Sequence, residues 1–169
     1  MANSISSWLF GKPRIVVENA REDDFHYLAK IHKEGFARGW SDGEFEALLS
    51  QQAFACLVAR KARAGGSYPV GFVVTKTVED ESEIITIAVT KNWRGNGIAR
   101  QLMDAAIRKL QADRVASLFL EVDETNKAAI ALYKKLGFSS IGQRESYYRQ
   151  RPDTNASSAA ALVMLRELG

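Results

Sequence analysis

The alternation of apolar and polar residues divides this chain into short apolar segments and segments of helical period. Period-2 or continuous apolar runs, bounded by turn residues, predict β-strands. These predicted strands cover residues 14–20, 53–61, 70–78, 81–90, 116–122, 138–148 and 159–168. Gly65 and Gly66 are expected to close a hairpin between the second and third of them.

The helical segments carry apolar residues three and four positions apart. Residues 22–36 form the first, with an apolar face made of Phe25, Leu28, Ala29, His32 and Phe36. Ser41 with Glu44 is a capping-box start for a short second helix. A helix of about 16 residues follows Gly97, with the apolar face Ile98, Leu102, Met103, Ala106 and Leu110. The last helix covers residues 126–137.

The predicted order is therefore β, α, α, β, β, β, α, β, α, β, β. Because a helix joins the strand at 81–90 to the strand at 116–122, these two strands are expected to be parallel. The fold class predicted is α/β, with one mixed sheet and helices on both faces.

The length and net charge of the chain limit the number of domains and the kinds of ligand that we expect. The 169 residues suit one domain, predicted as residues 13–169 after a flexible arm of residues 1–12. A formal net charge of +3 permits an anionic ligand without requiring one. Residues 60–63, with sequence RKAR, are expected to be a solvated loop, where RNA contact is a remote alternative.

The cellular compartment follows from three negative features. Cys56 is the single cysteine, so no intramolecular disulfide can form. The first residues lack the basic start and apolar stretch of a signal peptide. No apolar run approaches the roughly 20 residues that span a membrane. We therefore expect a cytoplasmic protein without a membrane partner.

The stretch NWRGNGIARQLM, residues 92–103, joins a predicted strand to a helix and contains Gly95 and Gly97. Such a turn lets backbone N–H groups at a helix N-terminus approach a phosphate. A dinucleotide fingerprint requires a third glycine where this chain has Arg100, although Glu121 stands where its ribose-binding acid would. A Walker loop is excluded because no G-K-[ST] follows.

The remaining pattern resembles the acyl-CoA motif [QR]-x-x-G-x-[GA] of the GNAT superfamily of N-acetyltransferases. A second GNAT signature, L-x-V-x-x-x-N-x-x-A-x-x-L-Y-x-x-x-G-F, lies between residues 120 and 138. It is matched at Leu120, Val122, Asn126, Ala129, Leu132, Tyr133, Gly137 and Phe138. Within the superfamily the chain is most similar to bacterial alanine N-acetyltransferases of ribosomal proteins.

This resemblance implies the GNAT fold with splayed central parallel strands and acetyl-CoA as co-substrate. It implies that the diphosphate is held by the motif and that the thioester lies beside the preceding strand. An N–H of Ala88 or Val89 would stabilise the thioester oxygen. The expected acetyl-CoA contacts are Ile87, Ala88, Val89, Arg94, Gly95, Asn96, Gly97, Ile98, Ala99, Arg100, Asn126 and Tyr133.

Two side chains are implied as catalytic. The resemblance implies Glu121 as the base. In a strand of period 2 it points away from Leu120 and Val122, so it can face a cleft; the alternative is a surface glutamate. Tyr133 is the expected general acid toward the leaving thiolate; the alternative is a core tyrosine with a solvated hydroxyl. Asn126 is expected both to cap its helix and to touch the cofactor.

The acceptor implied by the resemblance is a protein N-terminus, with an alanine-starting ribosomal protein as the partner. Its expected contacts are Phe36, Trp40, Tyr147 and Tyr148. A small-molecule amine and a non-catalytic CoA-binding role remain alternatives. We expect no metal, no direct nucleic-acid contact, and a monomer or weak dimer. His26 and His32 lack metal-binding spacing, and Cys56 is expected to be inert core.

Overall fold

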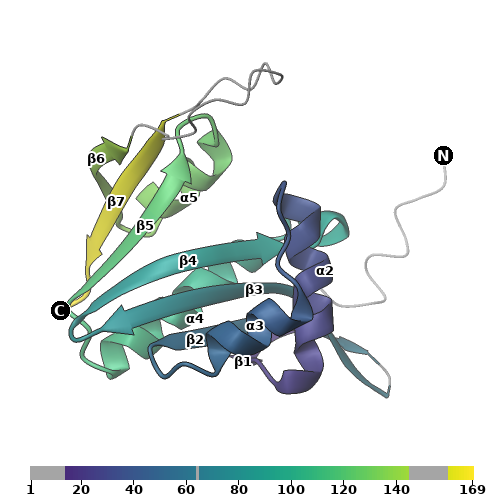
Figure 1. Cartoon of the computed structure of the whole chain (residues 1–169). Coiled ribbons are helices and arrows are strands. Elements are labelled where there is room, and N and C mark those ends of the chain that lie inside the picture. The colour runs from purple at the N-terminus through teal and green to yellow at the C-terminus, as the bar shows by residue number, and fades with distance from the viewer. Residues whose placement is uncertain (1–13, 64, 145–159) are drawn as a thin grey trace, which may run out of the picture. The chain divides into compact units, whose positions relative to one another are not determined.

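The computed structural model describes residues 14–63, 65–144 and 160–169 (Figure 1). The elements in the first half are β1 (Ile15–Asn19), η1 (Glu22–Asp24), α2 (Phe25–Gly35), α3 (Asp42–Leu49), β2 (Phe54–Arg63) and β3 (Gly66–Val78). They are followed by β4 (Glu81–Val89), η2 (Lys91–Trp93), α4 (Ile98–Ala112), β5 (Ser117–Asp123), α5 (Lys127–Lys135), β6 (Ser139–Arg144) and β7 (Ala161–Glu167).

The strands form one mixed sheet in the order β1-β2-β3-β4-β5-β7-β6. The predicted order of elements is confirmed, apart from the short 3-10 turns. The expected parallel pair is β4 and β5, whose ladder runs from Glu81 with Ser117 to Ile84 with Leu120. The ladder ends there although β4 continues to Val89 and β5 to Asp123. A ladder limited to the first part of both strands is what the predicted splaying requires.

The described residues form two compact units. The first takes those up to Val74 together with Thr86–Ala106, and the second takes Thr75–Ile85 and Ile107–Gly169. Strands β3 and β4 and helix α4 continue from one unit into the other. Both units lie in the segment predicted as one domain, and the predicted arm lies outside the described residues.

In the first unit, successive residues of β3 contact helices on opposite faces of the sheet. The Phe72 ring meets the ring of Phe45 from α3 edge-on, with centroids 5.4 Å apart. A Cβ on the preceding Gly71 would lie 3.3 Å from Ile98 Cγ2, at the start of α4. Figure 1 shows α3 and α4 on these two faces. Helices on both faces were expected from the order of the elements.

One expectation for this unit is wrong. Arg60, predicted in a solvated loop, is only 6% exposed and lies in β2 opposite Val16 of β1. The guanidinium is tolerated there because it forms ion pairs with Asp24, which is also buried, and with Glu18. The clustered positive charge of residues 60–63 favoured a loop, because the sequence does not show that the carboxylates of Asp24 and Glu18 lie beside Arg60.

In the second unit, β5 lies beside β7, which in turn lies beside β6. Leu118, Leu120 and Val122 of β5 are buried, whereas Phe119 and Glu121 alternate with them and face the other way. Among the described residues, no helix is long and apolar enough to cross a membrane.

Candidate active site

The glycine turn adopts a conformation that only glycine takes without strain. Gly95 has a φ of +77° and Gly97 a φ of +76°, and a Cβ at either position would meet no atom within 4 Å. The Asn96 amide donates to the carbonyls of Trp93 and Arg94, at 3.1 and 3.2 Å. Helix α4 begins directly after the turn, so its first N–H groups have no partner within the helix. The turn is therefore open and rich in donors.

The two flanking arginines already have partners. Arg94 donates from Nε to the Val89 carbonyl over 2.9 Å, which ties the turn to the end of β4. Arg100 Nε lies 3.6 Å from Asp104 one helical turn later. The remaining guanidinium N–H groups of these two side chains are the donors that suit a phosphate.

The end of β4 contains the residues expected beside a thioester. Ala88 is buried, while Ile87 and Val89 are partly buried on the opposite face of the strand. The sequence did not single out Thr86, whose Oγ1 is buried and has no hydrogen-bond partner among the described residues. Such an atom is costly unless a ligand or water supplies a partner.

Glu34 links helix α2 to the segment that follows β4. Its carboxylate accepts from Thr90 Oγ1 at 2.9 Å and from the Lys91 N–H at 2.8 Å. These groups begin the 3-10 turn that leads to the glycines. The end of α2 is therefore held next to the turn, a relationship that no local sequence pattern indicates.

The structure describes two of the four residues that are expected to contact the acceptor, Phe36 and Trp40. Phe36 is 42% exposed, and Phe36 and Trp40 both stack on the His32 ring, with centroids 4.3 and 4.6 Å away. Tyr147 and Tyr148 lie outside the described residues.

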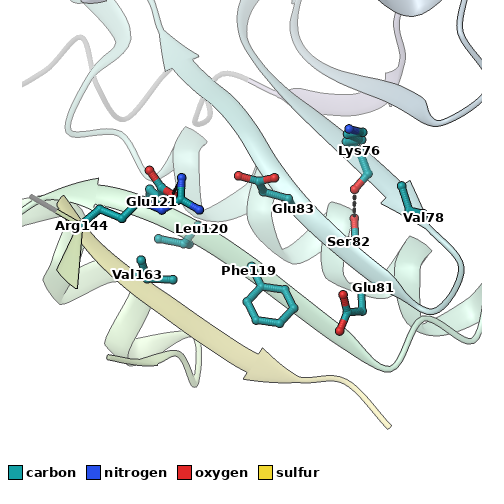
Figure 2. A pocket seen from close by; sticks show the side chains of 10 residues that line it. All are labelled: Lys76, Val78, Glu81, Ser82, Glu83, Phe119, Leu120, Glu121, Arg144 and Val163. Carbon is teal, nitrogen blue, oxygen red and sulfur yellow. Dashed lines mark hydrogen bonds and ion pairs between the residues drawn. The ribbon is translucent and has the colours of Figure 1, made fainter. Parts of the chain in front are cut away.

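The second unit contains a cavity of about 320 Å³ with Glu121 in its wall. Figure 2 shows Glu121 and Arg144 at one end and Glu81 with Val78 toward the other. The cavity is lined by Lys76, Val78, Glu81, Ser82, Glu83, Phe119, Leu120, Glu121, Arg144 and Val163. The prediction that Glu121 faces away from the core is confirmed, because its side chain is 37% exposed.

Arg144 is a site residue that sequence reasoning missed. Its Nη1 forms an ion pair with Glu121 Oε1 over 3.0 Å. Strand register explains the contact: Glu121 pairs with Val163, and Val163 pairs with Gly142 of β6. Gly142 and Arg144 share a face, and because Gly142 has no side chain, Arg144 can reach toward Glu121.

Tyr133 lies on α5 and is 7% exposed, with its ring edge-on to Phe138 at 5.9 Å. Burial raises the pKa of its phenol above the ordinary value, so the hydroxyl keeps its proton at neutral pH. No described residue forms a hydrogen bond with this hydroxyl.

Asn126 caps α5, because its side chain accepts from the Ala129 N–H over 3.2 Å. This confirms the capping half of its expected role. The cofactor half stays a prediction.

Cys56 is buried in β2, and burial raises the pKa of its thiol to about 12. A thiol that holds its proton so firmly is not a nucleophile at neutral pH, which agrees with the expected inert role.

Residues 25–138 match the profile of the Acetyltransferase (GNAT) family, and this segment includes both the glycine turn and the Tyr133 helix. The chain belongs to this family. A ribosomal protein bS18-alanine N-acetyltransferase of Haemophilus ducreyi is 30% identical over 149 residues, which cover 88% of this chain and 99% of the relative.

Solved structures agree with the fold. The ribosomal-protein-S18-alanine N-acetyltransferase of Escherichia coli has a TM-score of 0.78 and 27% identity, over 92% of this chain and 94% of that one. NAA60 of Arabidopsis thaliana, solved in complex with acetyl-CoA, has a TM-score of 0.76 over 92% and 99% of the two chains. At 18% identity the latter indicates the fold alone. The predicted GNAT fold and acetyltransferase class are thus confirmed.

Proposed function

We propose that this enzyme transfers the acetyl group of acetyl-CoA to the α-amine of a protein N-terminus, and that its acceptor is the N-terminal alanine of ribosomal protein bS18. The observation that carries the proposal is the placement of the Glu121 carboxylate in the wall of the cavity. The relatives that match almost their full length are named for acetylation of this alanine.

Two features of the first unit fit acetyl-CoA. The open turn at Gly95 and Gly97 leaves the N–H groups at the start of α4 accessible to a diphosphate. The unpaired hydroxyl of Thr86, two residues before Ala88, fits a group that brings its own hydrogen-bond partner. Arg94 and Arg100 add positive charge to the same turn. Acetyl-CoA supplies the acetyl group: the C–S bond of its thioester breaks as the amide C–N bond forms, and CoA leaves as a thiol.

Glu121 is assigned to the acceptor amine. An α-amine has a pKa near 8, so its deprotonation at pH 7 costs only about 1.4 kcal/mol and a carboxylate suffices. The incoming ammonium exchanges with the Arg144 guanidinium as the partner of this carboxylate. Glu121 then receives the proton, directly or through water.

Tyr133 is assigned to the leaving thiolate. Its phenol is protonated at neutral pH, since burial raises a pKa that is ordinarily 10.0, and its ring packs edge-on against Phe138. Proton donation by a positioned group contributes typically about 10²- to 10⁴-fold to a rate.

The decisive experiment incubates the protein with acetyl-CoA and a synthetic peptide that begins with the alanine of bS18. Release of CoA thiol and a peptide mass gain of one acetyl group are expected. Glu121→Gln should lower kcat about 10²- to 10⁴-fold without weakening CoA binding. Glu167→Gln is the matched control, because Glu167 is an exposed glutamate on β7 of the same unit and lies outside the cavity.

Acetyl transfer to lysine side chains with none to the N-terminus would contradict the acceptor assignment. In cells lacking the protein, mass spectrometry should find bS18 with a free N-terminal alanine, and an acetylated one would contradict the proposal.

A further inference from the structure

His32 is a buried histidine that the proposed chemistry does not use. It lies on the inner face of α2 and is 3% exposed. The rings of Phe36 and Trp40 both stack on the imidazole, within 22° of parallel to it. The rings of Phe45 from α3 and Phe72 from β3 surround it at 6.0 and 6.2 Å.

One hydrogen bond fixes the protonation state of this ring. The backbone N–H of Trp40 donates to His32 Nδ1 over 3.0 Å, so Nδ1 carries no proton and the neutral ring is protonated on Nε2. Burial lowers the pKa of His32, and the charge of Glu44 opposes this only in part. The imidazole is therefore neutral at pH 7.

The segment between α2 and α3 is held against α2 at a second point. A Cβ on Gly39 would come within 2.9 Å of Lys33 Cβ, so only a glycine allows the chain to pass this close. At its far end, Ser41 and Glu44 form a capping box at the start of α3. His32 is the part of this arrangement that can change its charge near neutral pH.

We propose that His32 is a positioning residue for the acceptor: its neutral imidazole holds Phe36 and Trp40 in the arrangement that binds the acceptor peptide, and protonation releases Trp40. Protonated Nδ1 is a donor that faces the Trp40 N–H donor, so the hydrogen bond is lost. The inference rests on the proposed function, because it takes these two aromatic side chains as acceptor contacts.

The surroundings of His32 give this switch a definite sign. Among the described residues packed against it, β3 contributes Phe72, and α3 contributes Phe45 together with the charge of Glu44. Acid pH therefore adds a charge for which Glu44 is the compensating group among the described residues. The Michaelis constant for the acceptor should rise as the pH falls below the ordinary range of a histidine side chain, because burial lowers the pKa of His32, whereas CoA affinity should not change.

The first test needs no acceptor. In a Trp8→Phe/Trp93→Phe background, the remaining Trp40 fluorescence is followed during a pH titration, because an indole released from the aromatic stack into water emits at a longer wavelength. This red shift should follow the NMR titration of His32, which is readily assigned since the chain has 2 histidines. Fluorescence that is independent of His32 protonation would overturn the proposal.

The second test measures acetylation of the alanine peptide from pH 5 to 8. His32→Phe keeps an aromatic ring and removes the acceptor atom, and His32→Gln keeps an acceptor and removes the ring. His32→Phe should raise the acceptor KM about 2- to 10-fold, the range for one lost hydrogen bond. His32→Gln should also raise it, because the stacking with Phe36 and Trp40 is lost. The kcat of both variants should be nearly unchanged. Neither should show the acid-dependent rise in KM. His26→Gln, an exposed histidine on the same helix, is the control that should behave as wild type.

The outcomes separate this inference from the proposed function. If the wild type acetylates the peptide and the His32 variants keep its KM at every pH, the positioning role is wrong. If the wild type acetylates no N-terminal peptide, the proposed function is wrong, and the fluorescence titration still decides whether His32 controls Trp40. Melting temperature and CoA affinity verify that each variant is folded.

Discussion

Arg144 Nη1 lies 3.0 Å from Glu121 Oε1, so the carboxylate assigned to the acceptor amine is already paired with a cation. Arg144 is 74% exposed, which means that solvent screens the pair and that it exchanges at little cost. An acceptor ammonium competes with the guanidinium for the same oxygen atoms.

Arg144→Gln should therefore lower the KM for a peptide acceptor. Exposed pairs contribute about 0.2–1 kcal/mol, so the decrease should be at most about fivefold, and it should shrink as salt screens the charges. Steady-state kinetics at two ionic strengths measure it. Arg108→Gln is the control, since it removes an exposed charge from α4 of the same unit without touching the cavity. A higher KM in Arg144→Gln would show that Arg144 contacts the acceptor instead.

Tyr133→Phe should reduce kcat about 10²- to 10⁴-fold while CoA affinity and melting temperature stay near wild type. The reason is that phenylalanine keeps the packing against Phe138 and removes only the hydroxyl, which has no partner among the described residues. The wild-type kcat should not fall between pH 8 and 10 through this group, because burial raises the pKa of Tyr133 above its ordinary 10.0. Loss of CoA binding in Tyr133→Phe would identify the hydroxyl as a binding group.

Local sequence patterns predicted those features of the site that depend on residues close together in the chain. The turn at Gly95 and Gly97 has the left-handed backbone that two glycines indicate, and Asn126 caps the helix that it precedes. Alternation along β5 was enough to place Glu121 outside the core. In each case the structure depends on residues within a few positions of one another.

Contacts between distant segments could not be predicted. Arg144 reaches Glu121 through a register across β7, and Glu34 reaches Thr90 from a helix 56 positions earlier in the chain. Arg60 was misplaced for the same reason, because its compensating carboxylate on Asp24 is 36 positions away. Strand register and the pairing of buried charges depend on tertiary packing, which local sequence patterns do not reveal.

Gly97→Ala should weaken CoA binding more than it destabilises the fold. A Cβ there meets no atom, so the cost comes from the φ of +76°, about 1–2 kcal/mol for a residue other than glycine. Relaxation of the turn toward a negative φ would redirect the N–H groups at the start of α4. Calorimetric titration with CoA measures the loss of affinity. Gly43→Ala is the matched control: Gly43 is in α3, also has open space around its Cα, and should gain stability from alanine. Equal CoA affinity in the two variants would argue against the turn as the diphosphate site.

The buried pair of Arg60 and Asp24 gives a stability prediction that is independent of catalysis. Both side chains are at most 7% exposed, and Asp24 also accepts from the Arg21 N–H over 2.7 Å. Arg60→Met leaves a buried carboxylate without its cation, so unfolding in urea should show a loss of about 3–5 kcal/mol. Arg60→Met/Asp24→Asn should recover much of that loss, because no uncompensated charge remains. Arg21→Met, which removes an exposed partner of Glu18, is the control and should cost less than about 1 kcal/mol. A double variant as unstable as the sum of its single variants would mean that the two charges do not interact.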